Sequence, residues 1–151
     1  MDEREPMRIA IGSDDRESLT EALLAELDRR GLEVERYGAI ADGSTAWASI
    51  GRAVGEAVAF GRAAVGIVCC WTGTGVSIAA NKVPGVRAAL CGDAATAAGA
   101  RKWNDANVLA LSLRATSVAV GLEILDAFLS TPVSGDAADR AEIEKLEGVL
   151  R

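Results

Sequence analysis

The sequence has 151 residues, of which 16 are Lys or Arg, 22 are Asp or Glu and none is His, so its formal net charge is −6. This length fits one domain over residues 1–151, and the acidic balance argues against a protein that binds nucleic acid through its phosphates. The absence of histidine excludes Ser-His-Asp and Cys-His nucleophile pairs, and it leaves zinc only cysteine and carboxylate ligands. We therefore expect no metal site.

Residues 1–6 (MDEREP) read as a polar extension, and no secretory leader or membrane-spanning apolar run is evident. The three cysteines, Cys69, Cys70 and Cys91, are an odd number, which leaves at least one thiol unpaired within the chain. Together these features favour a protein of the reducing cytoplasm that contacts neither membrane nor nucleic acid.

From Arg8 onward, short apolar runs alternate with amphipathic stretches. Strands are expected over residues 8–12, 32–37, 63–69, 86–91 and 108–112. Helices are expected over 18–30, opened by a capping box of Ser18 and Glu21, and over 49–60, 76–81, 94–102, 116–129 and 137–150. This alternation predicts an α/β fold, a doubly wound, Rossmann-like five-stranded parallel sheet in an α/β/α sandwich.

Two polar loops follow strands of this sheet, where ligands of open α/β sheets bind. Asp14 and Asp15 come directly after the first strand, either as a solvated turn or as carboxylates that bind substrate hydroxyls. The second loop, residues 70–75 (CWTGTG), leads from a buried strand into a helix. Its glycines allow close backbone approach, and the amides of a helix N-terminus bind anions and stabilise a thiolate at Cys70. The loop lacks both the Walker and the Rossmann glycine patterns.

Three segments carry a resemblance to a known family: Cys70–Lys82 (CWTGTGVSIAANK), Gly85–Cys91 (GVRAALC) and Asn104–Leu111 (NDANVLAL). They are similar to the ribose-5-phosphate isomerase B / galactose-6-phosphate isomerase family, and the similarity runs from Met7 to about Pro132. The resemblance implies an aldose–ketose isomerase that needs no cofactor or metal. It also implies a homodimer, or a tetramer, with the site at the subunit interface.

The resemblance further implies a role for each matching residue. A cysteine at the position of Cys70 moves the proton through a cis-enediolate, Thr72 and Asn104 orient or stabilise that intermediate, and Asp14 contacts the sugar. Backbone amides stabilise the developing charge, here those of Gly73, Thr74, Gly75 and Val76. In a dimer, Arg101 or the C-terminal Arg140 would reach the substrate of the partner subunit.

Several positions depart from the family pattern. Asp15 and Trp103 replace histidines, Trp71 replaces a glycine, Trp47 replaces a tyrosine, and residues 134–144 (SGDAADRAEIE) replace an arginine-rich segment. The three tryptophans either fill space or remodel the pocket, and in a chain with 4% aromatic residues we favour remodelling. Without a ring-opening histidine, the substrate is expected to be open-chain, such as a tetrose phosphate, or Asp15 or Asp105 opens the ring.

The predicted function is therefore isomerisation of a pentose or tetrose phosphate by cysteine-mediated proton transfer. Loss of the C-terminal arginines leaves open an isomerase of a non-phosphorylated sugar. A non-catalytic sugar-binding module on the same scaffold, with Cys70 as a packing residue, is the other alternative. A non-catalytic subunit is disfavoured because Cys70, Thr72, Gly73, Gly75 and Asn104 are all present.

Overall fold

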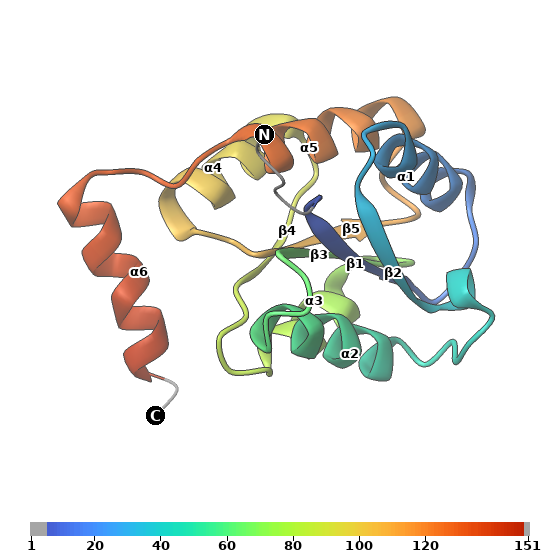
Figure 1. Ribbon diagram of the computed structural model, residues 1–151, viewed down its shortest axis with the longest axis horizontal. Helices are drawn as coiled ribbons and strands as arrows, with labels where there is room; N and C mark the ends of the chain where they lie inside the picture. Colours follow the sequence, from blue (N-terminus) through green and yellow to red (C-terminus); the bar gives the residue numbers. More distant parts are fainter. Residues whose placement is uncertain (1–5, 150–151) are drawn as a thin grey trace.

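A five-stranded parallel sheet forms the centre of the protein, which a computed structural model describes over residues 6–149 (Figure 1). Most of the expected polar extension and the end of the expected last helix therefore lie outside the described residues. The strand order is β2-β1-β3-β5-β4, and all neighbouring strands run parallel. The strands are β1 (Arg8–Ser13), β2 (Glu33–Gly38), β3 (Val65–Cys70), β4 (Ala88–Leu90) and β5 (Val108–Ser112).

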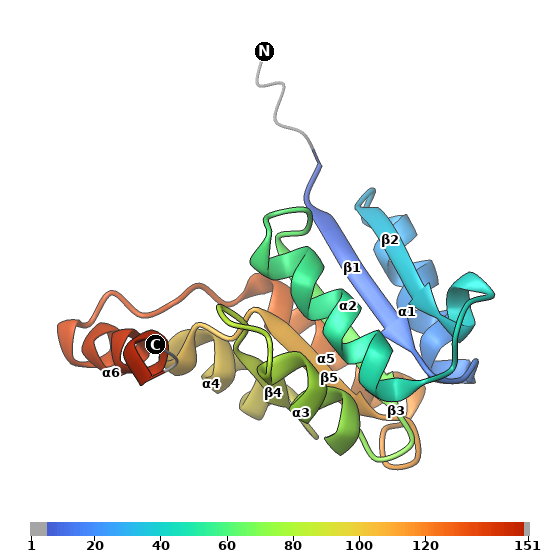
Figure 2. The same cartoon turned by 90° about the horizontal axis from the view of Figure 1, so that it is seen from below.

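Helices cover both faces of this sheet, so the predicted doubly wound α/β fold is confirmed (Figures 1 and 2). One face carries α2 (Trp47–Ala59) and α3 (Thr74–Asn81). The other carries α1 (Ser18–Arg29), α4 (Ala94–Asn104) and α5 (Val118–Ser130). The last helix, α6 (Ala137–Val149), packs against α4 at one end of the molecule and not on the sheet (Figure 1). A 3-10 turn, η1 (Ala39–Ala41), follows β2.

Two apolar clusters, one on each face, make up the core. Because successive side chains of a strand point to opposite faces, neighbouring strand residues fall in different clusters. Cys69 packs in the cluster beneath α1, α4 and α5, whereas Cys70 packs in the cluster beneath α2 and α3. This alternation fixes which of the two adjacent thiols faces the α3 side.

Helix starts differ from the predictions. The capping box predicted at Ser18 and Glu21 is wrong, because Ser18 is already helical and Glu17 is the N-cap residue. The Glu17 amide donates to Thr20 Oγ1 at 2.9 Å, and that hydroxyl donates to the Glu17 carbonyl at 2.8 Å.

Helices α2 and α3 each begin two residues earlier than expected, at Trp47 and Thr74. First-turn residues need not join the buried stripe, so hydrophobic periodicity does not mark them.

Candidate active site

The carboxyl ends of β1 and β3 mark the point where the strand order reverses, which is where ligands of open α/β sheets bind. Ser13 and Cys69 lie opposite each other in register, so Asp14 and Cys70 leave neighbouring strand ends. The Asp14 amide donates to the Cys69 carbonyl at 3.4 Å. A pocket of about 300 Å³ opens here, lined by Asp14, Trp47, Cys70, Trp71, Thr72, Thr74 and Gly75. We call it the loop pocket.

Cys70 is the last residue of β3 and is 5% exposed, with its side chain on the side of the sheet where α3 begins. The other two cysteines are poor candidates for thiolate chemistry. Burial raises the pKa of the Cys69 thiol to about 12, and burial followed by the Asp93 carboxylate raises the pKa of Cys91 to about 11. All three thiols are free. The structure thus brings one cysteine, Cys70, to the loop pocket.

The loop after Cys70 has a backbone that requires glycine. Gly73 has φ of +76°, and a Cβ atom there would lie 2.6 Å from Leu90 Cδ1 and 2.9 Å from the Leu111 carbonyl carbon. This turn starts α3 at Thr74, so the amides of Thr74, Gly75 and Val76 lie in the first helical turn, where no carbonyl of the same helix is available. Unpartnered amides at a helix N-terminus bind and stabilise negative charge.

Two of the three tryptophans lie at the loop pocket. The Trp47 ring covers Gly75, where a Cβ atom would approach Trp47 Cε3 to 2.8 Å, and Trp71 is 58% exposed. Trp103 lies elsewhere, on α4, and its ring covers Gly99 of the same helix. Within one chain, then, Trp103 does not line this pocket.

The two carboxylates after β1 have different surroundings. Asp14 lines the loop pocket and is half-buried, and burial raises the pKa of its carboxyl group, opposed by a backbone hydrogen bond and reinforced by the Asp15 carboxylate. Asp15 is exposed and accepts a hydrogen bond from the Arg16 amide at 2.8 Å through Oδ1. Asp14 is therefore placed to contact a ligand, whereas Asp15 completes the turn.

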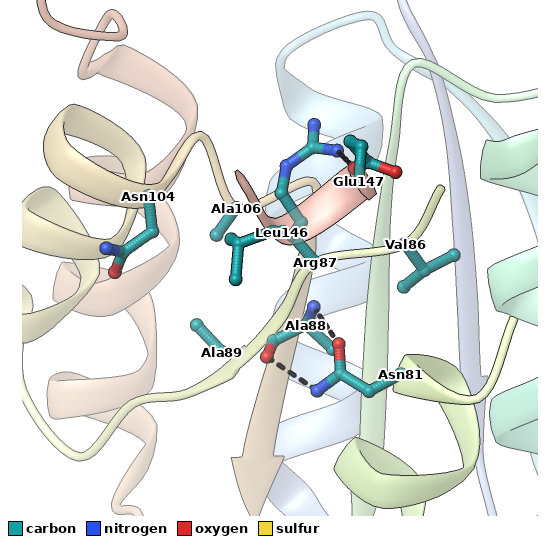
Figure 3. Close-up of a pocket in the computed structure, with 9 residues that line it drawn as sticks. All are labelled: Asn81, Val86, Arg87, Ala88, Ala89, Asn104, Ala106, Leu146 and Glu147. Carbon is teal, nitrogen blue, oxygen red and sulfur yellow. Dashed lines mark hydrogen bonds and ion pairs between the residues drawn. The ribbon is translucent and has the colours of Figure 1, made fainter. Parts of the chain in front are cut away.

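Asn104 lies at a second pocket, of about 480 Å³, between β4, the end of α4 and α6 (Figure 3). Its lining residues are Asn81, Val86, Arg87, Ala88, Ala89, Asn104, Ala106, Leu146 and Glu147. Asn81 pairs with the backbone at the edge of the sheet there. The Ala88 amide donates to Asn81 Oδ1 at 2.8 Å, and Asn81 Nδ2 donates to the Ala88 carbonyl at 3.0 Å. Within one chain, Asn104 and Cys70 line separate pockets.

The two arginines that the sequence analysis assigned to substrate binding also lie away from the loop pocket. Arg101 is largely buried and binds Asp105 Oδ1 at 3.0 Å and the Ala106 carbonyl at 2.6 Å. Arg140 is exposed on α6 and donates to the Ser134 carbonyl at 3.2 Å. Within one chain, none of Arg101, Arg140, Asn104 and Trp103 lines the loop pocket. Their assignment as ligands of a substrate therefore stays a prediction.

A cation that the sequence analysis missed lies next to the loop. Arg114 follows β5, and its amide donates to the Trp71 carbonyl at 3.0 Å. Its exposed side chain lines a pocket of about 280 Å³ that includes Thr72 and Thr116. Among residues 6–149 no ion pair occupies the Arg114 guanidinium. Its position just beyond a strand's carboxyl end is the signal that could have identified it.

Within the described residues, no group of three or more His, Cys, Asp or Glu side chains is arranged to hold a metal ion. Nor does any helix in this part of the chain have the length and apolar character that crossing a bilayer requires. The groups available for chemistry at the loop pocket are therefore a thiol, a carboxylate, hydroxyls, indoles and backbone amides.

The fold and the pocket together define a doubly wound α/β protein with a thiol and a helix N-terminus at its switch point. The profile of the family described as Ribose/Galactose Isomerase matches residues 9–146. The chain belongs to this family, as its sequence motifs predicted.

Curated relatives include sugar-phosphate isomerases. Ribose-5-phosphate isomerase B of Escherichia coli is 38% identical over 78% of each chain. D-erythrulose-4-phosphate isomerase of Pectobacterium atrosepticum is 34% identical over 93% of each. The Arabidopsis thaliana DNA damage-repair/toleration protein DRT102 is 40% identical over 85% of this chain, which spans only 41% of that longer protein.

Solved structures agree with this assignment. The type B ribose 5-phosphate isomerase of Trypanosoma cruzi superposes with a TM-score of 0.89 at 38% identity, covering 96% of this chain and 97% of that one. Ribose-5-phosphate isomerase B from Mycoplasma genitalium, solved with bound ribulose-5-phosphate, gives a TM-score of 0.86 at 31% identity over 95% of each chain.

Proposed function

We propose that this protein is a cytoplasmic, cofactor-independent aldose–ketose isomerase that acts on a tetrose or pentose phosphate as a homodimer. The observation that carries the proposal is the placement of the Cys70 thiol at the wall of a pocket that it shares with the first turn of α3. A base and a set of oxyanion donors on the same pocket are what an enediolate mechanism requires.

In the proposed step, the Cys70 thiolate removes the proton from the hydroxyl-bearing carbon next to the substrate carbonyl. The released electron pair forms the carbon–carbon double bond, and the carbonyl oxygen becomes an oxyanion. The amides of Thr74, Gly75 and Val76 would bind that oxyanion. The thiol then returns the proton to the former carbonyl carbon, and the hydroxyl proton moves to the other oxygen, so that the product is an isomer of the substrate.

Asp14 and Arg114 would bind the two ends of the substrate. Asp14 shares the loop pocket with Cys70, and a carboxylate there accepts hydrogen bonds from sugar hydroxyls. Arg114 lines the adjoining pocket, which shares Thr72 with the first. Its guanidinium forms no ion pair with residues 6–149, and such a group suits a phosphate. Loss of the C-terminal arginines favoured a non-phosphorylated sugar. A cation at the position of Arg114 weakens that argument.

The absence of histidine favours a substrate that is already open-chain. A tetrose 4-phosphate cannot close a furanose ring, because phosphate blocks its terminal hydroxyl. Similarity to D-erythrulose-4-phosphate isomerase over 93% of each chain supports a four-carbon substrate. Trp47 and Trp71 further support it, because two indoles at a pocket of about 300 Å³ leave less room for a longer sugar.

The proposed homodimer would complete the site. Asn104 and Trp103 lie apart from the loop pocket within one chain. A second copy that places these residues over the first copy's loop pocket would make one composite site from two chains.

The decisive assay is a panel of tetrose, pentose and hexose sugars, each with and without phosphate. We expect turnover of phosphorylated sugars only, with a tetrose phosphate as the best substrate by kcat/KM. Arg114→Gln should raise KM for the phosphate substrates. Exchange of the substrate C2 proton with deuterated water, followed by NMR, separates the enzyme from a binding module. Preferred turnover of ribose 5-phosphate would contradict the four-carbon proposal, and binding without exchange would contradict an isomerase.

Replacing Cys70 tests the identity of the base. Cys70→Ser should abolish exchange and turnover while leaving the protein folded, because a hydroxyl is a far weaker acid than a thiol. Cys69→Ala is the matched control, since Cys69 is buried on the other side of the sheet and should keep most of the activity. If Cys70→Ala retained most of the rate, the base would be a carboxylate, with Asp14 the first candidate.

A further inference from the structure

The turn that carries Asn104 has an unusual backbone. Asn104 is the last residue of α4, and Asp105, directly after it, has φ of +46° and ψ of +45°. This left-handed conformation is adopted by few residues other than glycine, although Asp and Asn tolerate it best. The helix therefore stops abruptly at Asp105, and the direction in which the Asn104 side chain leaves α4 depends on how that turn is held.

Two arginines hold Asp105. Arg101 Nη1 binds Asp105 Oδ1 at 3.0 Å, while Arg87 donates through Nε to the Asp105 carbonyl at 2.7 Å and through Nη2 to Oδ2 at 3.4 Å. Both arginine side chains are less than one-fifth exposed and the Asp105 side chain is 35% exposed, so solvent screens these contacts only in part. Each carboxylate oxygen thus has its own cation.

Arg87 is itself fixed on two further sides. Its amide donates to Asn107 Oδ1 at 2.7 Å, and its Nη1 binds Glu147 Oε1 of α6 at 2.5 Å (Figure 3). We call the group of Arg87, Arg101 and Asp105 the clamp. Through Arg87 it connects the start of β4 and the end of α4 to the last helix. Two cations and two carboxylates balance in charge, which a partly buried cluster needs if it is to be stable.

We propose that Asp105, held by Arg87 and Arg101, is a positioning residue that sets the orientation of Asn104 for the isomerisation. The inference rests on the proposed function, in which Asn104 orients or stabilises the enediolate. A helix could stop here with glycine alone, so a partly buried clamp of two arginines is more than a stop signal requires. Its carboxylate acts on the reaction through Asn104 and does not touch the substrate.

The test is a double-mutant cycle between positions 104 and 105, with kcat and KM measured on the best sugar phosphate of the panel. Asp105→Asn keeps a residue that tolerates the left-handed backbone but removes the charge that both arginines bind. We expect kcat to fall by about tenfold to a hundredfold with KM nearly unchanged, as for a misplaced catalytic group. In the Asn104→Ala background the same substitution should cause no further loss.

A second substitution keeps the test decisive if Asp105→Asn does not fold. Arg87→Lys retains the charge opposite Glu147 but loses the fork that reaches both the carbonyl and the carboxylate of Asp105, and it should reproduce the kcat loss. An unchanged kcat in both variants, or an equal loss with and without Asn104, would overturn the positioning role. A wild-type protein without isomerase activity would instead overturn the proposed function, and this inference with it.

Discussion

Asp14 illustrates how a side chain of the proposed site can lower the stability of the folded protein. Burial raises the pKa of its carboxyl group, which means that the folded protein binds this proton more tightly than the unfolded chain does. The ionised form is therefore unfavourable in the folded state at neutral pH. This penalty is absent below the ordinary carboxyl pKa of about 3.9, and it develops as the pH rises through the raised value.

Asp14→Asn should accordingly stabilise the protein while removing activity. At pH 7 we expect the free energy of unfolding to rise by less than about 1 kcal/mol, since water still reaches the carboxyl group. The gain should disappear near pH 3, where the wild-type carboxyl group is protonated as well. Urea unfolding at the two pH values measures the difference, and Glu123→Gln, which neutralises an exposed carboxyl group in the middle of α5, is the control. Destabilisation by Asp14→Asn at pH 7 would contradict this account.

At the scale of elements, the crossing of α2 and α3 sets where the loop over residues 70–75 lies. Gly51 of α2 lies so close to α3 that a Cβ atom there would be 2.7 Å from Ala79 Cβ and 2.8 Å from the Val76 carbonyl oxygen. Gly55, one turn later, would approach Val83 Cγ2 to 3.1 Å. Glycine thus allows the two helix backbones to approach, and the same approach brings Trp47 of α2 over Gly75 of α3.

Gly51→Ala should destabilise the protein although alanine is the better helix former. Overpacking a well-packed contact costs about 1–3 kcal/mol, which exceeds the helix-propensity gain of about 1 kcal/mol. Gly148→Ala in α6 is the matched control, because nothing lies within 4 Å of a Cβ atom there, and it should be neutral or stabilising. Urea denaturation compares the two, and equal effects of both substitutions would show that the crossing tolerates a methyl group.

Local sequence was enough to predict the sheet, the loop and its thiol, because Cys70 and the loop glycines lie in one contiguous segment after a buried strand. Asp14 followed from the rule that ligands bind beyond strand ends. The contact of Trp47 with Gly75 depends on how closely two helices cross, which no local pattern encodes. Arg114 also lies beyond a strand end, but its position beside Thr72 is a contact between segments far apart in the chain, which local sequence does not show.

For the whole molecule, the separation of the loop pocket from Asn104 is the property with the largest functional consequence. The resemblance to the family assigns both to one reaction, whereas one chain holds them at different places. The proposed homodimer resolves this difference, and the organisation of residues 1–151 as one domain stays a prediction beside it. The family resemblance implied a site between subunits, but no pattern in the residues themselves reports a contact between two chains, so local sequence alone could not place Asn104 relative to Cys70.

Mixing two impaired variants tests the composite site directly. Cys70→Ala should be inactive as a homodimer, whereas Asn104→Ala should keep a small but measurable fraction of wild-type activity. When the two are denatured together and refolded, half of the dimers should be mixed and hold one intact site of two, so about one quarter of wild-type activity should return. The two variants refolded separately and then combined on ice are the control. No recovery in dimers shown to be mixed would mean that both residues act within one chain.

The pairing of Asn81 with the backbone of Ala88 has a consequence for behaviour in a crowded cell. An unpaired edge strand is a template for another chain, and proteins protect such edges with polar side chains or very short strands. Here β4 spans three residues and its Ala88 groups are already occupied, while the opposite edge strand, β2, carries Glu33, Glu35 and Arg36. Both borders of the sheet therefore resist strand addition, which protects the protein against aggregation at high concentration.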